Sequence, residues 1–239
     1  MTISRPSFLP STVTFHSANS SESLALDLSV TIGKILIEAI RQKGGASIAV
    51  SGGITPISLF QKLSLLDINW AKVDLTLVDD RWVEPIHPDS NELLVKSNFI
   101  KNNALDVNFI PLKNDSKSAK DGHKFSEKLI KAISLPFDVI VLGMGSDGHT
   151  ASLFPCCDEL STGMDLNNSD CLVATSPKTA PHERMSLTAR VIYEAKSVFL
   201  HLNGSNKLDT LQEAMNYKDA SKMPIYNFLE KGLSVYWSP

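Results

Sequence analysis

The apolar run at residues 137–143 constrains the fold more than any other feature of this chain. Its centre, VIVL, holds no polar residue, which is typical of a strand buried on both faces, as in a parallel sheet covered by helices. The run ends at Gly143, and Asp147, Gly148 and His149 follow within a few positions. Ligands and catalytic groups of α/β proteins collect at the carboxyl ends of such strands. The turn therefore predicts a catalytic centre that contains Asp147 and His149.

Strand-like and helix-like segments alternate along the rest of the chain, with no repeat or long linker between them. Helices are predicted at about residues 21–43, 57–66, 90–100, 116–134 and 207–216. Strands are predicted at 47–50, 74–80, 107–112, 137–143, 171–175, 185–192, 197–203 and 233–237. This alternation indicates one α/β domain over residues 1–239, with a mainly parallel sheet and some antiparallel pairing among the closely spaced later strands.

Composition excludes several classes of protein. The net charge of −3 and pI near 6.1 give no basic field for nucleic acid or an anionic membrane. No apolar run approaches the roughly 20 residues of a membrane span, and the N-terminus does not resemble a secretory signal. The cysteines show no metal or redox spacing, so free thiols in a reducing cytoplasm are expected at Cys156, Cys157 and Cys171.

The loop SGGITP at residues 51–56 lies between a predicted buried strand and a predicted helix. Gly52 and Gly53 free the backbone, while Ser51 and Thr55 add hydroxyl groups. Backbone N–H groups at a helix N-terminus favour an anion, so the loop is a candidate phosphate site. The sequence lacks the P-loop pattern of nucleoside-triphosphate enzymes, and a plain capped glycine turn is the alternative interpretation.

Charged residues follow or precede three further predicted strands. Asp79, Asp80 and Arg81 end one strand, where burial is costly unless the charges are paired or used. A structural Asp–Arg salt bridge and an arginine that donates to a substrate oxygen both remain open. Arg184 and Lys207 lie where they can supply cations to a phosphate, although each is equally a surface charge in isolation.

The other motifs favour structural roles. GMGSDG at 143–148 fits the dinucleotide fingerprint G-x-G-x-x-G, but Pro155 follows too soon for the long helix that this fingerprint opens. HPDSN at 87–91 predicts a helix cap at Ser90. The remaining histidines have no recognisable constellation around them: His16, His123, His182 and His201.

Six motifs occur in the order SGGITP, DDRWV, HPDSN, GMGSDGHTASLFP, PHERMSLT and GSNK. Together they resemble the 6-phosphogluconolactonase family, within the wider group that contains the glucosamine-6-phosphate deaminases. The resemblance spans about residues 44–207. It implies a single Rossmann-like α/β domain, helices on both faces of the sheet, and cytoplasmic hydrolysis of 6-phospho-D-glucono-1,5-lactone to 6-phosphogluconate in the pentose phosphate pathway. It implies no cofactor and no metal.

Residue types and resemblance together predict a division of roles. His149 would act as general base on water, oriented by Asp147, with Arg81 beside the developing oxyanion. Which acid supports His149 stays open among positions 79, 80 and 147, with Asp79 included among the candidate catalytic residues. The substrate phosphate would be held by Ser51, Gly52, Gly53, Thr55, Arg184 and Lys207. The expected partner is this small sugar-phosphate lactone, and the expected state is a monomer or weak homodimer.

Two other functions remain as alternatives. The deaminases of the group resemble this chain but carry an acid immediately before the proline, where Phe154 stands here. A phenyl ring cannot move protons, although Asp158 and Glu159 lie nearby. A non-catalytic sugar-phosphate-binding protein would keep the anion loop and the basic residues but would have no use for Asp147 and His149.

Overall fold

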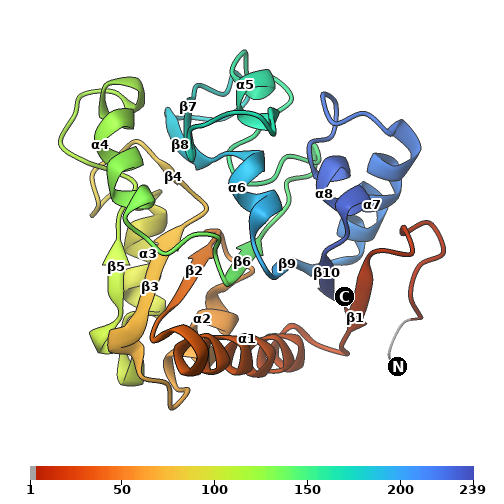
Figure 1. The fold of residues 1–239 in the computed structure, drawn as a ribbon. Helices are drawn as coiled ribbons and strands as arrows, with labels where there is room; N and C mark the ends of the chain where they lie inside the picture. Colours follow the sequence, from red (N-terminus) through yellow and green to blue (C-terminus); the bar gives the residue numbers. More distant parts are fainter. Residues whose placement is uncertain (1–3) are drawn as a thin grey trace.

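The computed structural model describes residues 4–239, and its centre is a sheet of seven parallel strands (Figure 1). The strand order across the sheet is β1(Thr14–Ser17), β10(Ser234–Ser238), β9(Val198–Asn203), β6(Val139–Leu142), β2(Ala46–Val50), β3(Val73–Leu77) and β5(Asn108–Ile110). The apolar run of the sequence forms β6, and all four of its residues are buried. The predicted α/β fold with a mainly parallel sheet is confirmed.

Helices cover both faces of this sheet. Figure 1 shows α1 and α2 on one side, and α6 with a small second sheet on the other. Ser20 caps α1 by accepting the Ser23 N–H, and Gly44 ends the helix at φ 82°, so α1 has the bounds predicted at 21–43. The helices are α1(Ser21–Lys43), α2(Ile57–Ser64), α3(Asn91–Asn98), α4(Ala119–Lys131), α5(Leu160–Met164), α6(Ala189–Glu194), α7(Ser205–Tyr217) and α8(Ile225–Lys231), with short 3₁₀ turns at Trp70–Lys72 and Asn102–Asp106.

The second sheet is not apparent from the sequence as a separate unit. It is antiparallel, in the order β4(Asp79–Arg81), β8(Arg184–Leu187) and β7(Leu172–Thr175). The predicted strand at 74–80 divides at Val78, whose N–H donates to Val50 of the main sheet and whose carbonyl accepts from Leu187 of the small one. The chain therefore changes sheets at this residue, and the antiparallel pairing expected among later strands lies here.

Several segments differ from the sequence prediction. The predicted strand at 185–192 ends at Leu187, and its second half is helix α6. An ion pair between Arg190 and Glu194 at i,i+4 spacing supports this helix over a strand. The elements β1, α5 and α8 escape prediction because their sequences are short and weakly periodic.

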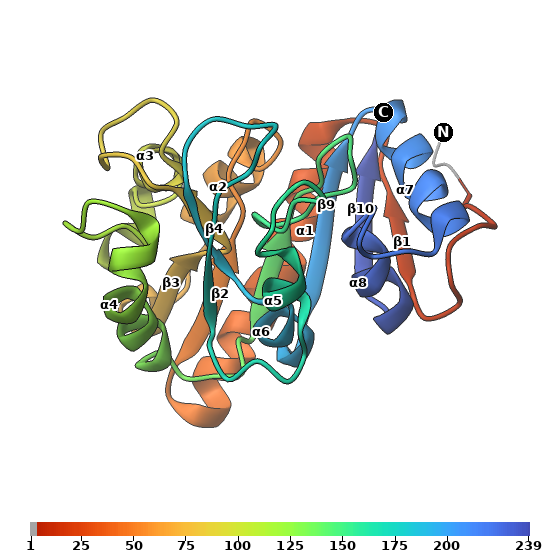
Figure 2. The ribbon, with the colours of Figure 1, turned by 90° about the horizontal axis from the view of Figure 1, so that it is seen from above.

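The carboxyl ends of β2, β6 and β9 meet at one edge of the main sheet, since neighbouring parallel strands end together (Figure 2). Val50 pairs with Val141, and the Ser51 N–H donates to the Val141 carbonyl at 2.9 Å. The loops that follow these strands are consequently neighbours, although about 90 residues separate them in sequence. Among the described helices, none combines the length and apolarity that a membrane crossing requires.

Candidate active site

Two adjoining cavities of about 160 and 200 Å³ open at this edge of the sheet. The larger is lined by Asp79, Arg81, His149 and Arg184, and the smaller by Thr55, His201 and Lys207. Both cavities share the lining residues Ser51, Gly52, Gly53, Gly143 and Met144. The imidazole and the candidate anion loop thus face one continuous space.

His149 is held from two sides. Its Nδ1 lies 2.6 Å from Asp147 Oδ1, and its ring stacks on Phe154 with centroids 4.0 Å apart. Contact between side chains only two residues apart requires a sharp turn of the backbone, and Gly148 provides this turn at φ 72°. A methyl group at Gly145 would lie 2.2 Å from His149 Nδ1, so this position also has to be glycine for the ring to occupy its place. The contact with Asp147 leaves Nε2 as the nitrogen available to a ligand.

The Asp147 carboxylate is stabilised in its charged form. Burial raises the pKa of Asp147, but the hydrogen bond and charge of His149 outweigh burial, and the pKa lies below its ordinary value. A charged carboxylate on Nδ1 keeps the proton on that nitrogen and favours a lone pair on Nε2. This arrangement is suited to a general base whose reactive nitrogen is Nε2.

The two adjacent acids that follow the change of sheet have different environments. Asp79 lines the larger cavity, and its Oδ2 accepts the Ser152 hydroxyl at 2.5 Å. Asp80 instead accepts the backbone N–H groups of Arg81, Asn91 and Glu92 at 2.7–3.2 Å, the last two at the start of α3. Burial raises the pKa of Asp80 to about 7, against the lowering effect of those hydrogen bonds. Of this pair, Asp79 is the acid that faces the cavity.

Two arginines face each other across the small sheet. Arg81 and Arg184 are directly opposite in the β4–β8 pairing, and both line the larger cavity. Arg81 Nη1 donates to the Asp89 carbonyl, and Arg184 Nη2 donates to the Pro181 carbonyl at 3.2 Å. Within residues 4–239, the Nε atom of each arginine is buried without a partner. Like charges placed opposite one another are unfavourable, so this pair is suited to an anion bound between them.

The candidate anion loop, residues 51–56, lies between β2 and α2. Gly53 has φ 96°, and a methyl group at Gly52 would lie 1.9 Å from the Asn91 side-chain oxygen, so both positions favour glycine. Among the described residues, the buried Ser51 hydroxyl finds no hydrogen-bond partner. The N-terminus of α2 follows at Ile57 without a side-chain cap. The loop therefore offers an unpaired hydroxyl and the backbone of two glycines to both cavities.

Lys207 and His201 form the far wall of the smaller cavity. Lys207, in the first turn of α7, extends its Nζ to the Met144 carbonyl at 2.8 Å. His201 is 2% exposed, neither ring nitrogen has a partner in the described part of the chain, and burial lowers its pKa to about 4. The sequence gives no constellation around His201, yet this residue lies in the cavity wall. The available signal was a polar residue near the carboxyl end of an otherwise apolar strand, beside other strand ends that carry site residues.

Fold and cavity together define an α/β protein whose candidate site brings a histidine, two arginines and a lysine next to a glycine loop. A family profile described as "Glucosamine-6-phosphate isomerases/6-phosphogluconolactonase" matches residues 19–237. The chain is 36% identical over 232 residues to a 6-phosphogluconolactonase of Pseudomonas putida, covering 97% of this chain and 95% of the relative. The crystal structure of a 6-phosphogluconolactonase from Shewanella baltica superposes with a TM-score of 0.93 at 38% identity, covering 97% of this chain and all of that one. The chain belongs to the glucosamine-6-phosphate isomerase/6-phosphogluconolactonase family.

Proposed function

We propose that this protein is a hydrolase that opens 6-phospho-D-glucono-1,5-lactone to 6-phosphogluconate. The observation that carries the proposal is the common cavity of His149 and the 51–56 loop, which provides a water-activating base and an anion site within one small space. Relatives at 34–39% identity over most of the chain are named 6-phosphogluconolactonases, which supports the same substrate.

The phosphate is assigned to the 51–56 loop and to the cations Arg184 and Lys207. The 51–56 backbone, the unpaired Ser51 hydroxyl and the Thr55 side chain line the smaller cavity, and a phosphate there would accept from these donors. Binding of the phosphate fixes the position of the sugar ring, and such positioning lowers the barrier of the step that follows.

Hydrolysis then proceeds from water held by His149. Nε2 takes a proton as the water oxygen bonds to the lactone carbonyl carbon, and Asp147 stabilises the imidazolium that forms. Arg81 donates to the developing oxyanion. The ring C–O bond breaks when the intermediate collapses, and the proton passes from His149 to the departing ring oxygen. The product holds one new carboxyl group and one new hydroxyl group, and no covalent enzyme intermediate is required.

Glucosamine-6-phosphate deamination is the second candidate within the family. That reaction needs acid–base groups for ring opening and isomerisation. The residue that stacks on His149 is Phe154, and the guanidinium of Arg184 lies 5.5 Å from the centroid of the same ring. Asp158 is exposed and pairs with Lys178 at 2.6 Å, away from the lining of both cavities. An apolar ring beside the base favours hydrolysis over deamination.

A coupled assay tests the proposal and separates the three candidates. Glucose-6-phosphate dehydrogenase generates the lactone in situ, and acid release is followed with and without this protein. A lactonase accelerates acid release well above the spontaneous rate. A deaminase releases ammonia from glucosamine 6-phosphate instead, and a binding protein binds phosphogluconate but accelerates neither reaction; either result contradicts the proposal.

The three free thiols support a reducing, cytoplasmic location for this activity.

A further inference from the structure

Three metal-ligating side chains that take no part in the proposed reaction converge at the rim of the cleft, the space that the two cavities form. His87 and Asp89 lie in the loop before α3, while His182 lies in the segment before β8, about 90 residues later. One ligand atom of each residue lies within 4.8 Å of those of the other two. We propose that this His87–Asp89–His182 cluster binds a divalent transition-metal ion of the zinc class.

The distances suit an ion of this size. His182 Nε2 is 2.9 Å from Asp89 Oδ2, and His87 Nδ1 is 3.9 Å from the same oxygen. A tetrahedral ion with bonds of about 2.0–2.1 Å holds its ligand atoms roughly 3.3 Å apart. Small side-chain rotations therefore bring all three atoms to bonding distance. The rings of His87 and His182 are already neighbours, with centroids 5.4 Å apart.

The hydrogen bonds of the two imidazoles identify the ring nitrogens that face Asp89. The Asp89 N–H donates to His87 Nδ1 at 3.1 Å, so the lone pair of that nitrogen points toward the Asp89 loop. An ion replaces this hydrogen bond and the one between His182 Nε2 and Asp89 Oδ2. Two imidazoles with one carboxylate favour Zn²⁺, Co²⁺ or Ni²⁺ over Mg²⁺ and Ca²⁺, which prefer oxygen ligands throughout.

The backbone holds His182 in an uncommon conformation. Its φ is 69°, in the left-handed region that non-glycine residues seldom occupy. Such a conformation persists where the surroundings enforce it, and it often accompanies a functional site. The side chains of His87, Asp89 and His182 are 42%, 50% and 29% exposed. An ion can enter from solvent and keep water in its open coordination position.

The site adjoins the two arginines of the cleft but is separate from them. Asp89 provides the carbonyl that accepts from Arg81, and His182 is two residues before Arg184. None of the three ligands is among the described residues that line the two cavities. The positive charges of Arg81 and Arg184 repel a cation at this site, and the Asp89 carboxylate offsets that repulsion. The ion would tie together the two segments that position Arg81 and Arg184.

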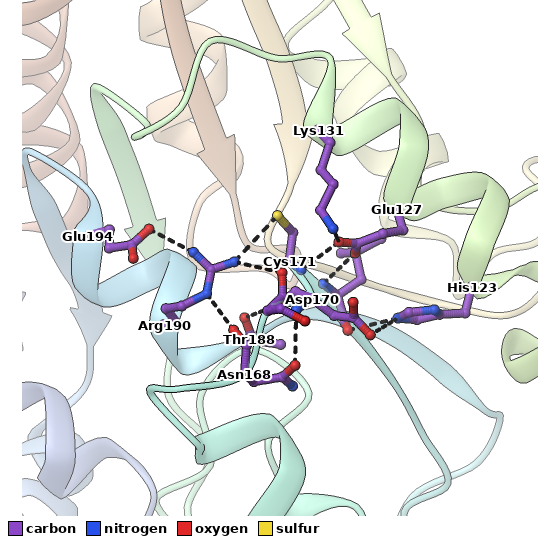
Figure 3. A network of polar contacts seen from close by, with 11 residues as sticks. His123, Glu127, Lys131, Asn168, Asp170, Cys171, Thr188, Arg190 and Glu194 are labelled. Atoms are coloured by element: carbon purple, nitrogen blue, oxygen red, sulfur yellow. Dashed lines mark hydrogen bonds and ion pairs between the residues drawn. The ribbon is translucent and has the colours of Figure 1, made fainter.

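Calorimetric titration of the chelator-treated protein with Zn²⁺ tests the site. We expect one ion per chain, with affinity reduced about tenfold or more in His87→Ala and in His182→Ala. His87→Ala is the sharper variant, because it keeps the His182–Asp89 ion pair. His123→Ala is the matched control, since His123 lies 4.0 Å from Asp170 in a second His–Asp pair that lacks a third ligand among the described residues (Figure 3).

Three results overturn the proposal: no binding, binding that is equal in the wild type and His87→Ala, or binding that is lost in His149→Ala instead. The last would place the ion on the Asp147–His149 pair. Co²⁺ gives an independent reading, because tetrahedral nitrogen and oxygen ligands produce visible absorption that should disappear in His182→Ala. Circular dichroism of each variant establishes that the exposed substitutions leave the fold intact.

Discussion

The cleft formed by the two cavities and the polar network between α4, β7 and α6 differ in whether their polar groups have partners within the chain. In the network of Figure 3, Arg190 donates to the Asn168 carbonyl at 2.6 Å and to Glu194 at 2.8 Å. Glu127 there accepts the Cys171 and Leu172 N–H groups at 2.8 and 2.9 Å and pairs with Lys131. Each of these charged groups therefore has partners within the chain.

The cleft instead leaves donors unused. Within residues 4–239, Ser51 Oγ, Arg81 Nε, Arg184 Nε and both nitrogens of His201 are buried without partners, and all four residues line the two cavities. Unpaired buried polar groups are costly, so proteins retain few of them. A structural network and a binding site can contain the same residue types, and the difference lies in whether the chain itself satisfies them.

The largest expected effect comes from the base. His149→Asn should lower kcat by about 10²–10⁴-fold, since it removes the group that accepts the water proton. Phosphogluconate binding and the midpoint of urea unfolding should change little. His123→Asn, in the structural network, is the matched control and should keep the wild-type kcat. A His149→Asn enzyme with near-wild-type turnover would remove His149 from the reaction.

The second effect concerns two carboxylates that both accept backbone N–H groups. Asp80 takes part in no ion pair among the described residues, and burial raises its pKa to about 7, whereas Glu127 pairs with Lys131. Between about pH 4 and 7 the folded state keeps a proton that the unfolded chain, with an aspartate pKa of about 3.9, has lost. The free energy of unfolding should therefore fall by up to about 4 kcal/mol as pH rises through this range.

Urea unfolding at several pH values, in the wild type and in Asp80→Asn, measures that slope. The variant should lose most of the decrease, because asparagine cannot ionise. Equal slopes in both proteins would show that the three N–H donors keep Asp80 charged throughout.

The third prediction compares an arginine of the cleft, Arg184, with an arginine of the polar network, Arg190. Arg184→Met should raise KM by about 10–100-fold, the loss of one or two charged hydrogen bonds to the substrate, with a smaller loss of stability than Arg190→Met because only the Pro181 carbonyl loses its donor. Arg190→Met should leave KM unchanged and cost about 1–3 kcal/mol, because it leaves the Asn168 and Ser169 carbonyls without a donor. Steady-state kinetics and urea unfolding of both variants decide the matter; a raised KM in Arg190→Met would abolish the distinction.

The smallest effect belongs to Lys207, whose Nζ already has a partner in the Met144 carbonyl. Lys207→Ala should raise KM by roughly tenfold with kcat nearly unchanged, since a flexible cation contributes to phosphate binding but not to proton transfer. The matched control is Lys218→Ala, because Lys218 lies at the opposite end of α7, outside the lining of both cavities. This control should behave as wild type in steady-state kinetics, and an unchanged KM in Lys207→Ala would place that residue outside the site.

Local patterns were sufficient for much of the fold. The helix predicted at 21–43 and the strand predicted at the apolar run 137–143 are both found, as α1 and β6, because helix periodicity and strand burial are local signals. The same holds for the 51–56 loop and the Asp147–His149 turn, whose chemistry is contained in a few consecutive residues. The strand at 74–80 appears continuous in the sequence because nothing local marks the change of sheet at Val78.

The α/β class, the glycine loop and a histidine–aspartate turn at a strand end all follow from short stretches of the chain. Other relations exist only in the folded molecule: Arg81 opposes Arg184, Asp79 rather than Asp80 faces the cavity, and His201 lies in its wall. These relations join segments about 100–150 residues apart. They depend on strand register and on the packing of one sheet against another, which no short stretch of sequence encodes.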